Sequence, residues 1–198
     1  MTDLFAPITF ARGPAWKNRF MLAPLTNCQS HADGSLSDEE FRWLTMRATG
    51  GFGLVMTCAA YVQAQGQGFP GQLGVYSDAL LPGLTRLAAK IKAEGAVSSV
   101  QLHHAGLRSP AELIGHAPVG PSEDAETGTR ALETEEVEQL AEDFIAAAVR
   151  AERAGFDGVE IHGAQRFGLT FCNRSPSRAH DHARFHRRRS HRINGDLR

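Results

Sequence analysis

The chain has 198 residues, 42% of them hydrophobic, and a formal net charge of −1 at pH 7. This length allows one good core, or a domain and a half. No apolar run approaches the roughly 20 residues that span a bilayer, and the first residues lack the basic and apolar regions of a secretory signal. The three cysteines fit neither a zinc site nor a disulfide framework. We therefore expect a cytoplasmic protein with reduced cysteines, no membrane partner and no metal site.

The first quarter of the chain predicts a hairpin, a strand and a helix. Residues 4–10 alternate weakly and are followed by a turn, which predicts a short hairpin with the residues around Trp16. Residues 19–25 form a short apolar run, typical of a buried strand. The run at 37–40, Ser-Asp-Glu-Glu, has the pattern of a capping box and predicts a helix that ends at Gly50.

Strands and helices then alternate. Residues 53–60 are uncharged and flanked by glycine, as expected for a strand that is covered on both faces. Residues 80–94 carry apolar side chains at helical spacing, and 97–102 form the third strand. A second amphipathic helix is predicted from a cap at 134–136, and 157–162 form the fourth strand.

Long loops connect some of these elements. The loop after the second strand is rich in glycine, and residues 107–132 contain several prolines and glycines. Loops of this length in a compact domain are usually functional. The loop at 107–132 is therefore expected to help shape a pocket.

The alternation of strands and helices predicts an α/β fold with a parallel sheet and right-handed crossovers. Polar residues stand at the carboxyl ends of the predicted strands, the rim that carries the chemistry in α/β barrels. They are Thr26, Gln101, His103, His104, Glu160 and His162. A full eight-stranded barrel takes about 250 residues, so about half of one is expected. A small doubly wound sheet is the alternative, although no G-x-G-x-x-G follows any strand.

Four segments in this order, LFAPITF…KNRFMLAPLT, GGFGLVMTCAAYVQAQGQG, VQLHHAG and AGFDGVEIHGA, resemble the Old Yellow Enzyme family. The resemblance covers residues 4–164. It implies the N-terminal half of a (β/α)8 TIM barrel, with about four parallel strands behind a short hairpin. It also implies an FMN-dependent oxidoreductase in which hydride passes from NAD(P)H through FMN to an activated alkene, such as an α,β-unsaturated carbonyl. The substrate and the choice between NADH and NADPH stay open.

The resemblance also implies roles for single residues. Pro24, Leu25 and Thr26 match the segment that contacts the flavin, and Thr26 matches the residue that hydrogen-bonds the ring. Ala59 matches a small residue beside the ring, and Gln101 matches the glutamine that binds its pyrimidine edge. His162 matches the first of two residues that hold a substrate carbonyl oxygen, where donors stabilise the charge that develops as hydride arrives.

Two pairs of rim residues have alternative interpretations. His103 and His104 could suggest a metal pair, but neighbours on a strand point to opposite faces. One is therefore expected to face the site and the other to pack outward. Glu160 and His162 share one strand face and fit either a buried structural pair or site residues.

The chain departs from the family pattern directly after His162. Gln165 stands where the family has its second carbonyl ligand, Arg166 replaces a glycine, and Phe167 replaces the tyrosine that donates a proton. The segments that the family carries further along its chain are not recognisable. With them the flavin phosphate site, expected after strands seven and eight, is expected to be absent.

The sequence from 165 to 198 has a different composition. It holds nine Arg, four His and two Asp, no Glu or Lys, and no apolar periodicity. We divide the chain into a partial FMN-binding barrel at 1–164 and a basic, disordered tail at 165–198. Our hypothesis for the tail is translation in a shifted reading frame.

These features leave a second function open. It is a truncated, non-catalytic remnant whose Arg-rich tail binds polyanions without specificity. A half barrel is expected to be weakly stable and prone to aggregation, with poor FMN affinity. For an active protein the expected partners are a small-molecule substrate and, as an open point, a second copy of the chain. No specific nucleic-acid partner is expected.

Overall fold

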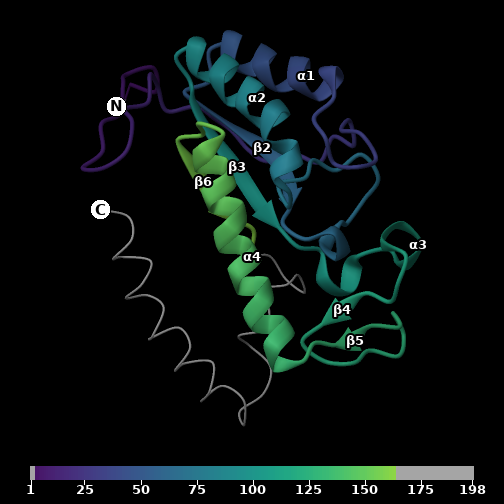
Figure 1. The fold of residues 1–198 in the computed structure, drawn as a ribbon. Helices are drawn as coiled ribbons and strands as arrows, with labels where there is room; N and C mark the ends of the chain where they lie inside the picture. Colours follow the sequence, from purple (N-terminus) through teal and green to yellow (C-terminus); the bar gives the residue numbers. More distant parts are fainter. Residues whose placement is uncertain (1–2, 164–198) are drawn as a thin grey trace.

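A four-stranded parallel sheet organises residues 3–163, the part of the chain that the computed structural model describes (Figure 1). Its order is β1 (Met21–Leu22), β2 (Leu54–Tyr61), β3 (Val97–His103) and β6 (Gly158–Ile161). The parallel α/β fold predicted from the sequence is therefore confirmed. The predictions for the tail, and for Gln165, Arg166 and Phe167, lie outside the described residues.

Three helices connect the strands and cover one face of this sheet (Figure 1). They are α1 (Asp38–Thr49), α2 (Leu81–Ala93) and α4 (Thr134–Arg153). Between them and the sheet lies the main core, which includes Val55, Leu84, Ile91, Val100 and Ala147, all fully buried. Burying one large aliphatic side chain contributes about 1.5–3 kcal/mol, so this layer holds the strands in place.

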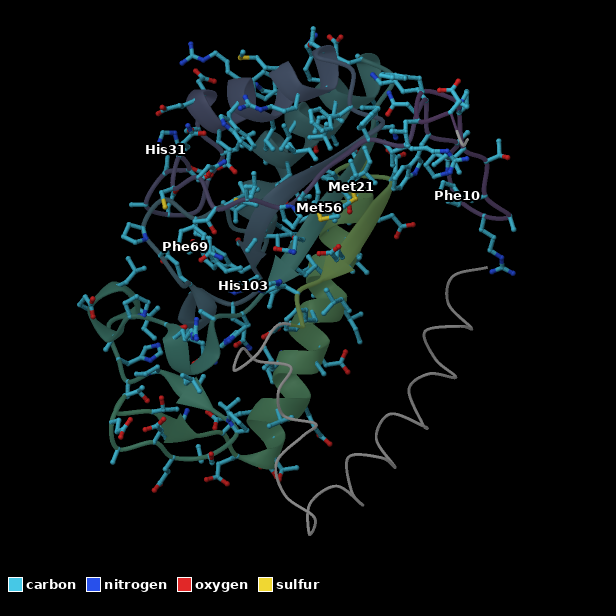
Figure 2. All side chains as sticks on the ribbon, turned by 180° about the vertical axis from the view of Figure 1, so that it is seen from behind. Phe10, Met21, His31, Met56, Phe69 and His103 are labelled. Atoms are coloured by element: carbon cyan, nitrogen blue, oxygen red, sulfur yellow. The ribbon has the colours of Figure 1, made fainter. Side chains whose placement is uncertain are left out.

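The opposite face of the sheet is much less covered. Leu54, Met56 and Val97 form a small second cluster there, with Trp16 packed against it. Figure 2 shows this face from behind with Met21 and Met56 labelled, and Met21 pairs in register with Leu54 of the cluster. The Met21 side chain, on the outermost strand, is 42% exposed. Trp16 belongs to the predicted hairpin, which is confirmed in a minimal form by two backbone hydrogen bonds of 2.9 Å with Ile8.

The first strand is shorter than its apolar run predicts. Only Met21 and Leu22 pair with β2, whereas the sequence predicts a strand over 19–25. Pro24 has no backbone N–H and cannot continue a ladder, so the chain leaves the sheet before it. Residues 23–29, which follow β1, have no regular secondary structure.

Two helix starts also differ from the prediction. Helix α2 begins at Leu81 after a 3-10 turn, η2 (Asp78–Leu80), rather than at residue 80. Helix α4 is capped by Glu133, and Thr134 is its first helical residue. The Glu136 carboxylate accepts a hydrogen bond of 2.8 Å from the Glu133 N–H, so the capping box lies one residue earlier than predicted.

The loops contain short elements that the sequence does not reveal. The loop after β2 includes η1 (Ala64–Gly66), and the loop after β3 holds η3 (Gly106–Arg108) and α3 (Ala111–Ile114). Two short strands, β4 (Val119–Gly120) and β5 (Arg130–Ala131), pair in parallel in the same loop. This loop forms a lobe beside the start of α4 (Figure 1). Within residues 3–163, no helix combines the length and apolar character that a bilayer crossing requires.

Candidate active site

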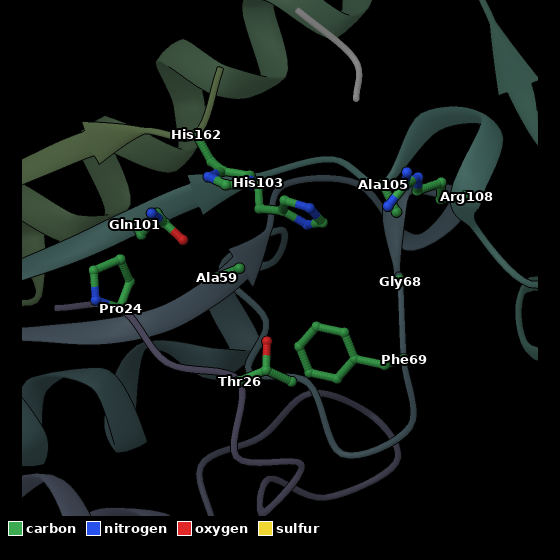
Figure 3. Close-up of a pocket in the computed structure, with 10 residues that line it drawn as sticks. All are labelled: Pro24, Thr26, Ala59, Gly68, Phe69, Gln101, His103, Ala105, Arg108 and His162. Carbon is green, nitrogen blue, oxygen red and sulfur yellow. The ribbon is translucent and has the colours of Figure 1, made fainter. Parts of the chain in front are cut away.

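A pocket of about 410 Å³ lies at the carboxyl ends of the parallel strands (Figure 3). Five of the six site residues predicted from the sequence line it, namely Pro24, Thr26, Ala59, Gln101 and His162. The sixth, Leu25, has a side chain that is 53% exposed and does not line the pocket. Since the carboxyl ends of parallel strands meet at one edge, residues up to 138 positions apart in sequence converge here.

A β-bulge turns Ala59 toward this pocket. The register between β2 and β3 shifts between Met56 and Ala59. Thr57 takes up the extra position, where its hydroxyl accepts from the Gln101 N–H at 3.3 Å and donates to the Cys58 carbonyl at 2.8 Å. Val55 and Cys58 both reach the helix-side core, which strict alternation would forbid. The bulge therefore resets the phase, so that Ala59 rather than Cys58 faces the pocket.

The amide of Gln101 is oriented by Glu160, its neighbour on β6. Gln101 Nε2 donates a 2.7 Å hydrogen bond to Glu160 Oε1. A carboxylate can only accept in such a bond, which identifies the end of the amide that carries the nitrogen. The Gln101 oxygen points into the pocket (Figure 3). Gln101 can thus offer a ligand an acceptor and its second N–H.

The far side of the pocket is formed by Thr26 and Phe69. The Thr26 hydroxyl points into the pocket, and the Phe69 ring stands beside it (Figure 3). Phe69 belongs to the glycine-rich loop after β2, which is tied to the loop after β1 by a 2.9 Å hydrogen bond from the Ser30 N–H to the Gly71 carbonyl. Two loops from neighbouring strands therefore hold these side chains as a unit.

His103, the last residue of β3, lines the pocket, whereas His104 does not. His104 is 1% exposed, its Nε2 donates to Gln63 Oε1 at 3.2 Å, and its Nδ1 accepts from the Gly106 N–H at 3.0 Å. Gln63 in turn donates to Asp143 of α4. The opposite orientations expected for the two histidines are confirmed, and His104 joins the loops after β2 and β3 to α4.

Burial keeps both histidines neutral. Desolvation, and then the neighbouring His162 and His104, lower the pKa of His103 to about 3. Desolvation lowers the pKa of His104 to about 4, although Asp143 opposes this shift. Neither ring is therefore charged near neutral pH.

These two pKa shifts predict a loss of stability on mild acidification. Between the unfolded pKa near 6.5 and the folded values, the unfolded state binds two protons that the folded state does not, so stability falls as pH falls. We expect the free energy of unfolding to fall by about 2 kcal/mol between about pH 7 and about pH 5.5. Urea unfolding at both pH values measures this change. In H104Q the pH dependence of the free energy of unfolding should drop to about half, because only one buried histidine remains. If the stability of the unchanged protein does not vary between these pH values, the two lowered pKa values are wrong.

Several pocket residues are absent from the sequence prediction of the site. They are Gly68, Phe69, Ala105 and Arg108. Arg108 comes from η3, so it reaches the pocket only because the chain turns back after β3. The loop lengths indicated that these segments are functional, but no periodicity shows which of their side chains turn inward.

The chain as a whole is similar to known proteins in sequence and in structure. Residues 3–173 match the NADH:flavin oxidoreductase / NADH oxidase family. The chain belongs to this family. Its sheet and helices correspond to the N-terminal part of the barrel of the Old Yellow Enzyme homologue from Zymomonas mobilis, with a TM-score of 0.76 and 31% identity over 84% of this chain and 50% of that chain.

Two relatives of this flavin oxidoreductase family show how much of a whole protein the chain represents. It is 43% identical to the "Probable NADH-dependent flavin oxidoreductase YqiG" of Bacillus subtilis, over 83% of this chain and 45% of that protein. It is 37% identical to the NADH:acrylate oxidoreductase of Vibrio harveyi, over 84% of this chain and 17% of that protein. The chain thus spans less than half the length of either relative.

The described residues fit the ring of FMN, the cofactor of this family. The pocket volume lies within the range of about 300–1,000 Å³ that is typical of small-molecule sites. Pro24 and Ala59 offer small apolar surfaces, and the Gln101 amide offers the donor and acceptor that a pyrimidine edge requires. These side chains are therefore of the chemical types that a flavin ring requires.

Proposed function

We propose that this chain forms the flavin-ring part of an FMN-dependent NAD(P)H oxidoreductase that reduces an activated alkene, such as an α,β-unsaturated carbonyl compound. The convergence of Pro24, Thr26, Ala59, Gln101 and His162 in one pocket carries this proposal. FMN, when bound, supplies a carrier that accepts a hydride from NAD(P)H and delivers it to the alkene. Both relatives compared above carry NADH in their names, so NADH is the reductant to test first.

The residues of the chain orient the reactants. Gln101 and Thr26 would hold the edge of the flavin ring, and His162 would donate a hydrogen bond to the carbonyl oxygen of the alkene. This oxygen gains negative charge as hydride reaches the β-carbon, so a donor placed there lowers the barrier. The α-carbon takes a proton from water, which balances the reaction as the addition of two hydrogens across one double bond.

Purification of the full chain tests the proposal. A protein that retains or takes up FMN in a one-to-one ratio, and oxidises NADH only when an enone such as cyclohex-2-enone is present, supports it. A protein that binds no FMN when the cofactor is supplied in excess supports the non-catalytic remnant instead. Under that alternative, salt-sensitive binding of the chain to a polyanion such as heparin is expected.

Replacement of Gln101 tests the assignment of the flavin edge. Q101L removes the amide donor and acceptor but keeps an apolar side chain of similar size. We expect the affinity for FMN to fall about tenfold, the equivalent of about 1.4 kcal/mol, because the ring edge loses its polar partners. Titration with FMN, followed by flavin fluorescence, measures the change.

Gln139 provides the matched control. It is an exposed residue of α4 and donates a 3.0 Å hydrogen bond to Asp143 Oδ1, away from the pocket lining. Q139L should leave FMN affinity unchanged. Equal affinities of Q101L and the unchanged protein would show that Gln101 does not contact the flavin.

A further inference from the structure

His103 occupies a position in the pocket that the family-based assignment leaves without a role. It is the last residue of β3, is 4% exposed, and its side chain projects into the pocket near His162 (Figure 3). A buried imidazole in such a position needs a reason, because burying a polar group costs free energy unless it is hydrogen-bonded. Its surroundings give that reason and define which of its nitrogens carries hydrogen.

Gln72 fixes the tautomer of the His103 ring. The Gln72 side chain is fully buried, and its Oε1 accepts from the Gly68 N–H at 2.7 Å. Its Nε2 donates to the Ala59 carbonyl at 2.8 Å and lies 3.1 Å from His103 Nδ1. Because the first two partners define the orientation of the amide, Nε2 must donate to Nδ1 as well. His103 therefore carries its hydrogen on Nε2.

The distance between the two histidines suits a shared acceptor. The ring centroids of His103 and His162 lie 5.2 Å apart with a tilt of 44°. One oxygen that accepts two hydrogen bonds of about 2.9 Å at a tetrahedral angle has its donors about 4.7 Å apart. Rings at this separation can both reach such an oxygen.

We propose that His103, locked by Gln72 as the Nε2–H tautomer, is a second hydrogen-bond donor to the substrate carbonyl oxygen, beside His162. The inference rests on the proposed function and adds to it a donor on β3, outside the segment after β6 where the family places its pair. A ring that stays neutral polarises the carbonyl group without transferring a proton to it. Developing charge on the oxygen would then be shared by two donors that are held before the substrate arrives.

Three variants of the full chain, loaded with FMN, test the role in turnover. H103F removes the donor, and we expect kcat/KM for cyclohex-2-enone to fall about 100-fold. Reduction of the bound flavin by NADH, measured by stopped-flow absorbance, should change less than about threefold, because hydride transfer from NADH needs no donor at the enone oxygen. H103Q keeps an N–H donor and should restore kcat/KM to within about tenfold of the unchanged protein. H116F removes an exposed histidine that does not line the pocket, and should have no effect.

Nitrogen NMR of the histidine rings tests the tautomer without any turnover. Protonated and bare ring nitrogens differ strongly in ¹⁵N shift, so the His103 ring should show hydrogen on Nε2 alone from about pH 8 to about pH 5. Q72L should add a population with hydrogen on Nδ1. A ring that carries hydrogen on Nδ1 in the unchanged protein overturns the inference.

The kinetic outcomes separate this inference from the proposed function. If the unchanged protein reduces cyclohex-2-enone and H103F keeps the same kcat/KM, the inference is wrong and the proposed function stands. If H103F loses flavin reduction by NADH and enone reduction to the same extent, His103 acts on the flavin site as a whole and the inference is again wrong. If the unchanged protein binds no FMN, the proposed function fails and the inference fails with it.

Discussion

Replacement of Glu40 by alanine is expected to lower the free energy of unfolding by about 4 kcal/mol. Glu40 lies on α1 and is fully buried. Its carboxylate accepts hydrogen bonds from the Ser30 hydroxyl, from Asn27 Nδ2 at 3.3 Å and from Cys58 Sγ at 3.1 Å. Alanine would leave the buried donors of Ser30 and Cys58 without an acceptor, as well as the partly buried donor of Asn27. Each unsatisfied buried donor costs about 1–3 kcal/mol. Urea unfolding followed by circular dichroism measures the loss.

The adjacent Glu39 provides a matched control, because it is exposed on the same turn of α1. E39A should change stability by less than about 0.5 kcal/mol. E40Q keeps the shape and one accepting oxygen, so its loss should be intermediate. If E40A and E39A have equal stability, the hydrogen bonds accepted by the Glu40 carboxylate contribute nothing to the free energy of unfolding, and the prediction is wrong.

Glu40 also shows where the capping-box prediction was half right. The Ser37 hydroxyl accepts from the Glu40 N–H at 3.0 Å, as a helix cap requires. The Glu40 side chain, however, turns inward to Asn27 and Ser30 instead of back to the cap. The sequence pattern is the same whether the Glu40 side chain turns back to the cap or inward. Only the packing of the loop after β1 decides which of the two occurs. The thiol of Cys58 in the same network stays protonated, because burial and then Glu40 raise its pKa well above its ordinary value.

The order of strands and helices could be predicted because each has a local signal. Apolar side chains repeat at helical spacing in α2 and α4, and β2 is an uncharged run between glycines. The bulge at Thr57 has no such signal, since it depends on a backbone N–H from β3 that donates to this hydroxyl. Strands of two residues, such as β4 and β5, are too short for any periodicity to show.

The site was predictable to the extent that it follows the strand ends. Thr26, Ala59, Gln101 and His162 each stand within four residues of the carboxyl end of a strand, and parallel pairing brings these ends together. Phe69 and Gln72 reach the site through the path of a loop, which no spacing rule describes. The hydrogen bond that fixes the tautomer of His103 therefore follows only from the contacts of Gln72 in the structure, and not from the sequence.

The path of that loop depends on Gly71, whose replacement by alanine is expected to cost about 4 kcal/mol. The residue has a φ of +69°, in the left-handed region, where a side chain costs about 1–2 kcal/mol. A Cβ there would also lie 2.4 Å from the Cys28 carbonyl oxygen and 2.7 Å from its carbon. These are backbone atoms that no rotamer change can move, so the loops after β1 and β2 must separate. Thermal unfolding measures the loss of stability, and FMN titration should show weaker binding because Thr26 and Phe69 lie on these two loops.

Gly95 separates the two causes, because it has the same φ of +69° and a Cβ added there would meet nothing within 4 Å. G95A therefore carries the backbone cost alone, about 1 kcal/mol, and should leave FMN affinity unchanged. The difference between the two variants measures the contact between Gly71 and Cys28. If G71A and G95A lose the same amount of stability, the loops after β1 and β2 separate without an energetic cost. The contact between Gly71 and Cys28 would then not position Thr26 and Phe69.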